Sequence, residues 1–129
     1  MPINSRQKGA RCEREAAELF RDQGYDGARR GCQFSGGEDS PDIVVPGLEH
    51  IHFEVKAVQN LNVHNALAQA VRDGGPTKVP VVLHKKNGTG WLVTMRGEDW
   101  FNFLEAYQKY EKSIPLPVPH PPIADSSVG

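Results

Sequence analysis

Three stretches of the chain place apolar residues at the spacing of one helix face. From Ser5 to Gln23 the apolar side chains form a single arc, and Gly24 supplies a stop. Leu61 to Arg72 shows the same periodicity and ends before Gly74-Gly75-Pro76. A third helix is predicted from Asp99 to Tyr110.

The segments between these helices have the pattern of strands. They are Tyr25 to Phe34, Asp42 to Val45, Ile51 to Ala57, Val79 to His84 and Trp91 to Met95. Asn87-Gly88 lies between the last two and is typical of a tight turn in a hairpin. Pro46-Gly47 predicts a second turn, and residues 35–40 (SGGEDS) predict a loop.

The predicted order is therefore helix, strand, strand, strand, helix, strand, strand, helix. This order indicates one α/β domain over residues 1–113, with a mixed central sheet flanked by helices. From Ile114 onwards (IPLPVPHPPIADSSVG) proline recurs too often for a regular element, so residues 114–129 predict an extended or disordered tail. Trp91, Trp100 and Phe101 are interpreted as core residues.

The amino-acid composition indicates the class of protein but not its function. Of 129 residues, 38% are apolar and 24% are charged, which is ordinary for a globular domain. No apolar run approaches the ~20 residues of a membrane span, and the first residues lack the apolar segment of a secretory signal. Cys12 and Cys32 do not form a disulfide framework. We expect a cytoplasmic protein with no membrane partner.

The net charge of −1 hides a clustering of signs. Residues 1–35 hold seven Lys or Arg against five Asp or Glu, and residues 61–96 hold five against one. Residues 36–60 and 97–129 each hold five acidic residues against one and two basic ones. This arrangement permits a basic groove around an acidic centre, and it is equally consistent with solvated surface charge.

Polar residues interrupt the apolar strands where packing favours apolar ones. Along Ile51 to Ala57 the side chains alternate, so His52, Glu54 and Lys56 share one face. That face is either exposed to solvent or gathers polar groups for a purpose. Asp42 precedes a short strand, and the Pro46 to His50 turn would bring it beside Glu54 unless it is an ordinary cap or turn residue.

Glu13 falls in the middle of the apolar arc of the first helix. A buried carboxylate costs several kcal/mol unless a cation or hydrogen-bond donors compensate it. Glu13 therefore pairs with an arginine, reaches water at the helix edge, or contributes to a cation site. Three carboxylates together would suit a hard cation, and Lys56 beside them would orient water or stabilise charge on phosphate oxygens.

These residues resemble the signature of the PD-(D/E)XK nucleases, in Pro41-Asp42 followed by Glu54-Val55-Lys56. A more specific stretch, residues 8–15 (KGARCERE), is similar to the opening of the archaeal-type Holliday junction resolvases. The resemblance continues through Gly24-Tyr25, Arg29 and the Ser35-Gly36-Gly37 loop and covers about residues 8 to 95. It implies a restriction-endonuclease-like core, and a small prokaryotic or viral enzyme of DNA recombination and repair.

The resemblance also implies roles for single residues. Glu13, Asp42 and Glu54 would be ligands of Mg²⁺ or Mn²⁺ and Lys56 the catalytic lysine. Ser35 would be the functional serine of the loop before the second acidic strand, with Ser40 as the alternative. Gln69 would reach the site from the second helix, unless it is a solvated helix residue.

We predict a Mg²⁺-dependent endonuclease that acts on branched DNA, as a homodimer because two symmetric cuts resolve a junction. Arg29, Arg30, Lys85 and Lys86 are the predicted contacts to the DNA backbone, or else solvated surface residues. The alternatives are another PD-(D/E)XK nuclease (nicking, repair or restriction-like) and an inert DNA-binding module. His50 and His52 have the spacing of a zinc pair, but no further soft ligand lies close in sequence, so no zinc site is predicted.

Overall fold

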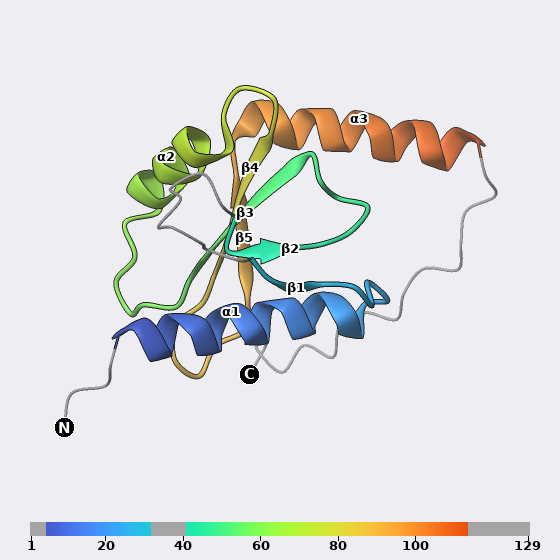
Figure 1. Cartoon of the computed structure of the whole chain (residues 1–129). Coiled ribbons are helices and arrows are strands. Elements are labelled where there is room, and N and C mark those ends of the chain that lie inside the picture. Colours follow the sequence, from blue (N-terminus) through green and yellow to red (C-terminus); the bar gives the residue numbers. More distant parts are fainter. Residues whose placement is uncertain (1–4, 32–40, 114–129) are drawn as a thin grey trace, which may run out of the picture. The chain divides into compact units, whose positions relative to one another are not determined.

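The computed structural model describes residues 5–31 and 41–113 (Figure 1). The chain divides into two compact units, Met1–Arg96 and Gly97–Gly129, and each is described by itself. The predicted loop at residues 35–40 and the predicted tail at 114–129 lie outside the described residues. So do Cys32, Ser35 and Ser40.

The order of elements is the order predicted from the pattern of apolar positions. The elements are α1 (Ser5–Asp22), β1 (Arg29–Arg30), β2 (Ile43–Val44), β3 (Ile51–Lys56), α2 (Val63–Gly74), β4 (Val79–His84), β5 (Leu92–Met95) and α3 (Gly97–Ser113). The prediction of an α/β fold with a mixed sheet and flanking helices is confirmed.

The five strands form one sheet in the order β1-β2-β3-β4-β5. Neighbouring strands are antiparallel except for β3 and β4, which are parallel and run in register from Ile51 opposite Val79 to Lys56 opposite His84. The connection between the two parallel strands contains α2, as a crossover of this kind requires. The turn around Gly88, whose φ is 79°, joins β4 to the antiparallel β5.

The two helices of the first unit cover opposite faces of the sheet (Figure 1). Cys12, Ala16 and Ala17 of α1 pack in one buried cluster with Phe53 and Val55 of β3. On the other face, a smaller buried cluster joins Ala66 and Ala70 of α2 to Val82 of β4. Because side chains alternate along a strand, β3 presents His52, Glu54 and Lys56 to the α2 face.

Two elements begin two or more residues later than the sequence pattern predicted. The strand expected from Tyr25 starts at Arg29, because the preceding residues form a turn in which the Ala28 N–H donates to the Tyr25 carbonyl. The helix expected from Leu61 starts at Val63, because the Asn62 side chain caps it by accepting the Asn65 N–H at 3.0 Å.

The second unit contains α3, which carries several exposed aromatic side chains. The side chains of Trp100 and Phe101 are 53% and 66% exposed, so their interpretation as core residues is wrong. Trp91, in the first unit, is partly buried and packs against the larger core cluster as predicted. Among the helices of the described part of the chain, none is long and apolar enough to cross a membrane.

Candidate active site

The centre of the candidate site is the point where β2 separates from β3. The backbone N–H of Asp42 donates to the Phe53 carbonyl at 2.9 Å, and Ile43 pairs with Phe53. One step further along β3, the N–H of Val55 donates instead to Oδ2 of Asp42 at 2.7 Å. The carboxylate of Asp42 thus bonds to β3 at the point where the short strand β2 begins, which fixes its position.

Gly31, which directly follows β1, contacts the backbone at Asp42. Its N–H donates to the Asp42 carbonyl at 2.8 Å. A Cβ atom at this position would lie 2.0 Å from the Pro41 carbonyl oxygen, so no larger residue fits without a backbone shift. The close approach of Gly31 therefore sets the path of the chain that leads into Asp42.

The polar face of β3 is buried, which excludes the solvated alternative for His52 and Glu54. Their side chains are 3% and 4% exposed, and His52 Nε2 lies 2.9 Å from Oε1 of Glu54. Lys56, the third residue on this face, is partly buried at the end of the strand. α2 covers the face, so the polar groups occupy an interior position between helix and sheet.

Glu13 reaches the same end of the sheet from α1. Its side chain is 15% exposed, and its Oε1 accepts a hydrogen bond from Arg30 Nε at 3.1 Å. The sequence left three alternatives for this carboxylate, and the described structure contains the pairing with an arginine. Glu13 nevertheless lies near enough to Asp42 to raise the pKa of that residue.

One open cavity of about 430 Å³ brings the predicted residues together. It is lined by residues of α1, of the β2 and β3 region and of α2: Lys8, Gly9, Cys12, Glu13, Asp42, Glu54, Val55, Lys56, Ala57, Val58 and Gln69. All five predicted site residues that the structure describes at this end of the sheet line it. Gln69 contributes from α2 and is partly buried there.

The carboxylates of the cavity perturb one another. Burial and, after it, the neighbouring charge of Glu54 together raise the pKa of Asp42 from its ordinary 3.8 to about 8. Burial would also raise the pKa of Glu54, but hydrogen bonds with His52 and Asp42 outweigh it, so this pKa lies below its ordinary value. In the absence of a cation, Asp42 therefore retains a proton that it shares with Glu54.

A residue outside the predicted set joins this cluster. Asp73, in the last turn of α2, has its pKa raised by partial burial and by interaction with Glu54. Among the described residues, the ligand atoms of His52, Glu54 and Asp73 lie within 4.8 Å of one another, a group that does not include Glu13 or Asp42. No pattern along the chain pointed to Asp73, because helix α2 brings it to β3 from a distant part of the chain.

The predicted DNA contacts lie in two separate places. Arg29 and Arg30 of β1 line a groove of about 520 Å³ together with Arg11, Arg14 and Arg21 of α1, and the groove also contains Glu15 and Glu18. Arg30 connects this groove to the cavity that contains Asp42 and Glu54 through its bond to Glu13. The clustering of basic residues anticipated in residues 1–35 thus corresponds to an arginine-rich groove.

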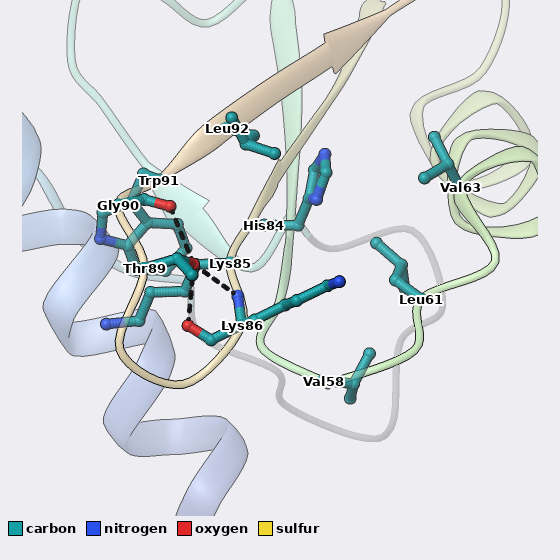
Figure 2. Close-up of a pocket in the computed structure, with 10 residues that line it drawn as sticks. All are labelled: Val58, Leu61, Val63, His84, Lys85, Lys86, Thr89, Gly90, Trp91 and Leu92. Carbon is teal, nitrogen blue, oxygen red and sulfur yellow. Dashed lines mark hydrogen bonds between the residues drawn. The ribbon is translucent and has the colours of Figure 1, made fainter. Parts of the chain in front are cut away.

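Lys85 and Lys86 follow β4 at a second pocket, of about 460 Å³ (Figure 2). Its walls are largely apolar, and Val58 lines both this pocket and the cavity that contains Asp42 and Glu54. Figure 2 shows the two lysine side chains pointing in opposite directions, with Lys86 extended toward Leu61. Lys85 Nζ lies 5.1 Å from the ring centre of Trp91 and 3.1 Å from Oε2 of Glu15.

Comparison with known proteins gives one match. The model of the archaeal Holliday junction resolvase (hjc) family matches residues 4–96, which include α1, the complete sheet and all the cavity residues described above. No curated protein and no solved structure matches the chain significantly.

Proposed function

The chain belongs to the archaeal Holliday junction resolvase family, and from this premise we propose that it is a divalent-cation-dependent endonuclease that cuts four-way DNA junctions. The observation that carries the proposal is the single cavity lined by Glu13, Asp42, Glu54 and Lys56. Side chains from α1, from β3 and from the residue just before β2 meet there, with acidic and basic groups at one open surface.

The donor set of this cavity fits a hard cation such as Mg²⁺ or Mn²⁺. Carboxylate oxygens are the ligands that these ions prefer. Asp42 and Glu54 already interact closely enough to share a proton, which a cation would displace. Glu13 would become a third ligand by exchanging its bond with Arg30 for one to the cation. When bound, the ion would supply positive charge at the phosphate and lower the pKa of the attacking water.

The other residues of the cavity would act directly on substrate and water. The ammonium group of Lys56 would donate to the attacking water or to a phosphate oxygen and so stabilise the charge that develops in the transition state. Gln69, which lines the cavity from α2, would orient water through its amide. Val55 N–H keeps the Asp42 carboxylate aligned through the 2.7 Å bond, so this ligand needs little reorganisation.

DNA would approach over the two basic surfaces. Arg29 and Arg30 would contact phosphates in the arginine-rich groove beside the cavity, and Lys85 and Lys86 would contact them on the other side. Phosphate contacts supply charge and position without reading bases, which suits an enzyme that recognises DNA shape. Ser35, whose position lies outside the described residues, remains a proposed contributor by family resemblance.

Two symmetric cuts require two active sites, so we propose that the enzyme is a homodimer. β5 is the last strand of the sheet, and its Leu92 and Val93 side chains are 61% and 63% exposed. An exposed apolar edge strand favours pairing with another chain. The exposed aromatic residues of α3 in the second unit provide a further candidate surface.

Comparison of three labelled DNAs tests the proposal: a four-way junction, a nicked duplex and a linear duplex of the same sequence, each with Mg²⁺ or Mn²⁺. Paired cuts confined to the junction would support a resolvase. Equal cutting of all three would assign another nuclease of the same fold, and tight binding without cutting under either ion would favour an inert module.

A further inference from the structure

Behind the catalytic cavity, a nitrogen ligand stands beside two carboxylates. His52 Nε2 and Glu54 Oε1 are 2.9 Å apart, and a carboxylate oxygen of Asp73 completes a set in which all ligand atoms lie within 4.8 Å of one another. Two ligand atoms bound tetrahedrally to one ion at about 2.1 Å lie about 3.4 Å apart. A movement of about 1.5 Å or less by the partly exposed Asp73 side chain, with a small separation of Nε2 from Oε1, would therefore close the set around an ion.

The imidazole is held in place rather than free to turn away. His52 is 3% exposed, and it packs against Gly74, the last residue of α2. A Cβ atom on Gly74 would lie 2.8 Å from Cβ and 3.0 Å from Cγ of His52. Glycine at this position therefore leaves room for the histidine ring, while the neighbouring Asp73 supplies the third ligand from the same helix end.

The chemistry of this set differs from that of the catalytic cavity. Imidazole nitrogen suits Zn²⁺ and other late first-row ions, whereas Mg²⁺ prefers oxygen alone. We propose that His52, Glu54 and Asp73 form a second cation site that is selective for Zn²⁺ over Mg²⁺. Solvent would complete the coordination from the side of Asp73, and the ion would replace the hydrogen between Nε2 and Oε1.

This site would regulate the nuclease, an extension that rests on the proposed function. Glu54 belongs to both ligand sets, and its Oε1 already faces His52 rather than the catalytic cavity alone. Zn²⁺ bound between His52 and Asp73 would retain Glu54 in this orientation and withdraw a ligand from the Mg²⁺ site. Zn²⁺ is then expected to inhibit cleavage that Mg²⁺ supports.

Calorimetry with Zn²⁺ on the full chain, without DNA, tests the site. We expect His52→Gln and Asp73→Asn each to weaken Zn²⁺ binding at least tenfold, and Glu13→Gln, which alters only the catalytic set, to leave it unchanged. Circular dichroism checks that each variant is folded, and Asp73→Asn, at a partly exposed position, keeps the test valid if His52→Gln does not fold. Cys12→Ser controls for binding to the buried thiol.

Wild-type Zn²⁺ affinity in both His52→Gln and Asp73→Asn would overturn the site, as would a loss confined to Glu13→Gln or Cys12→Ser. Titration of Zn²⁺ into a Mg²⁺-supported cleavage reaction then tests regulation, with stronger inhibition of wild type than of Asp73→Asn as the expected result. Inhibition that is equal in both proteins would overturn it. A protein that binds Zn²⁺ through His52 but cuts no DNA would contradict the proposed function and leave the second site intact.

Discussion

Without a divalent cation, the folded protein should lose stability as the pH rises, and Asp42 should be the cause. Its pKa is raised from 3.8 to about 8, first by burial and then by the charge of Glu54. Between these two values the folded protein binds a proton that the unfolded chain does not. The free energy of unfolding must therefore fall as the pH rises through this window.

The size of the effect follows from the shift. Each pKa unit corresponds to about 1.4 kcal/mol, so a shift of four units sets an upper limit of about 5 kcal/mol. Relaxation of side chains and entry of water into the open cavity reduce this figure. We expect a loss of about 2–4 kcal/mol between pH 5 and pH 8.5. Glu54 does not contribute in this range, because its lowered pKa affects stability only below its ordinary value of 4.5.

Urea unfolding followed by circular dichroism measures the effect, at pH 5, 6.5 and 8.5 in the presence of a chelator. Asp42→Asn is the matched variant, because it keeps the shape of the side chain and has no proton to lose. The difference between the two proteins cancels the titration of all groups that they share. Wild type should show the loss, and Asp42→Asn should lack most of it.

Added cation gives a second readout in the same experiment. An ion that binds only the folded protein stabilises it by about 2.7 kcal/mol at a concentration of 100 times its Kd. Mg²⁺ or Mn²⁺ should therefore restore the stability of wild type at pH 8.5 and have little effect on Asp42→Asn. Parallel pH profiles of the two proteins, with equal responses to the ion, would refute the reasoning.

Three further substitutions have separate expected outcomes. Lys56→Met should lower the single-turnover rate of junction cleavage by about 10²–10³-fold, while the affinity for the junction in a gel shift changes little. The exposed Lys109→Met is the control. Equal losses of rate in both variants would contradict the role of Lys56. Gly31→Ala should lower the cleavage rate at least tenfold, because its Cβ would meet the Pro41 carbonyl oxygen at 2.0 Å; a normal rate would show that this path is not needed. Leu92→Lys should shift a dimer to monomer in sedimentation with little change in melting temperature, and an unchanged dimer would exclude β5 from the interface.

The sequence predicted the elements whose patterns are strong and local. Alternation in β3, helical spacing in α1 and α2, and the Asn87-Gly88 turn all correspond to elements of the structure. The strand expected from Tyr25 begins only at Arg29, because glycines and an aspartate precede Arg29 and favour turns. The interpretation of Trp100 and Phe101 as core residues was wrong for another reason. Aromatic residues on a helix suit a core and an exposed binding surface equally well.

Part of the candidate site could also be predicted, because some of its residues lie in strong local patterns. Asp42, Glu54 and Lys56 interrupt apolar strands that are adjacent in the chain, so their meeting follows from one hairpin-like connection. The bond between Arg30 and Glu13 and the approach of Asp73 to Glu54 depend on how helices dock on the sheet. Contacts of this kind link distant parts of the chain and have no periodic signature. The Zn²⁺ site proposed above uses only His52 of the histidine pair and depends on Asp73 of α2, which spacing along the chain does not reveal.

The central claim is that the carboxylates of one cavity support cation-dependent cutting of a junction. The most direct test is the single-turnover cleavage of a labelled four-way junction in Mg²⁺ by wild type, Glu54→Gln and the exposed control Glu105→Gln. We predict paired cuts by wild type and Glu105→Gln, none in chelator, and a loss of about 10³-fold in Glu54→Gln. Cutting by Glu54→Gln at the wild-type rate would contradict the account, because the buried carboxylate at its centre would then be dispensable.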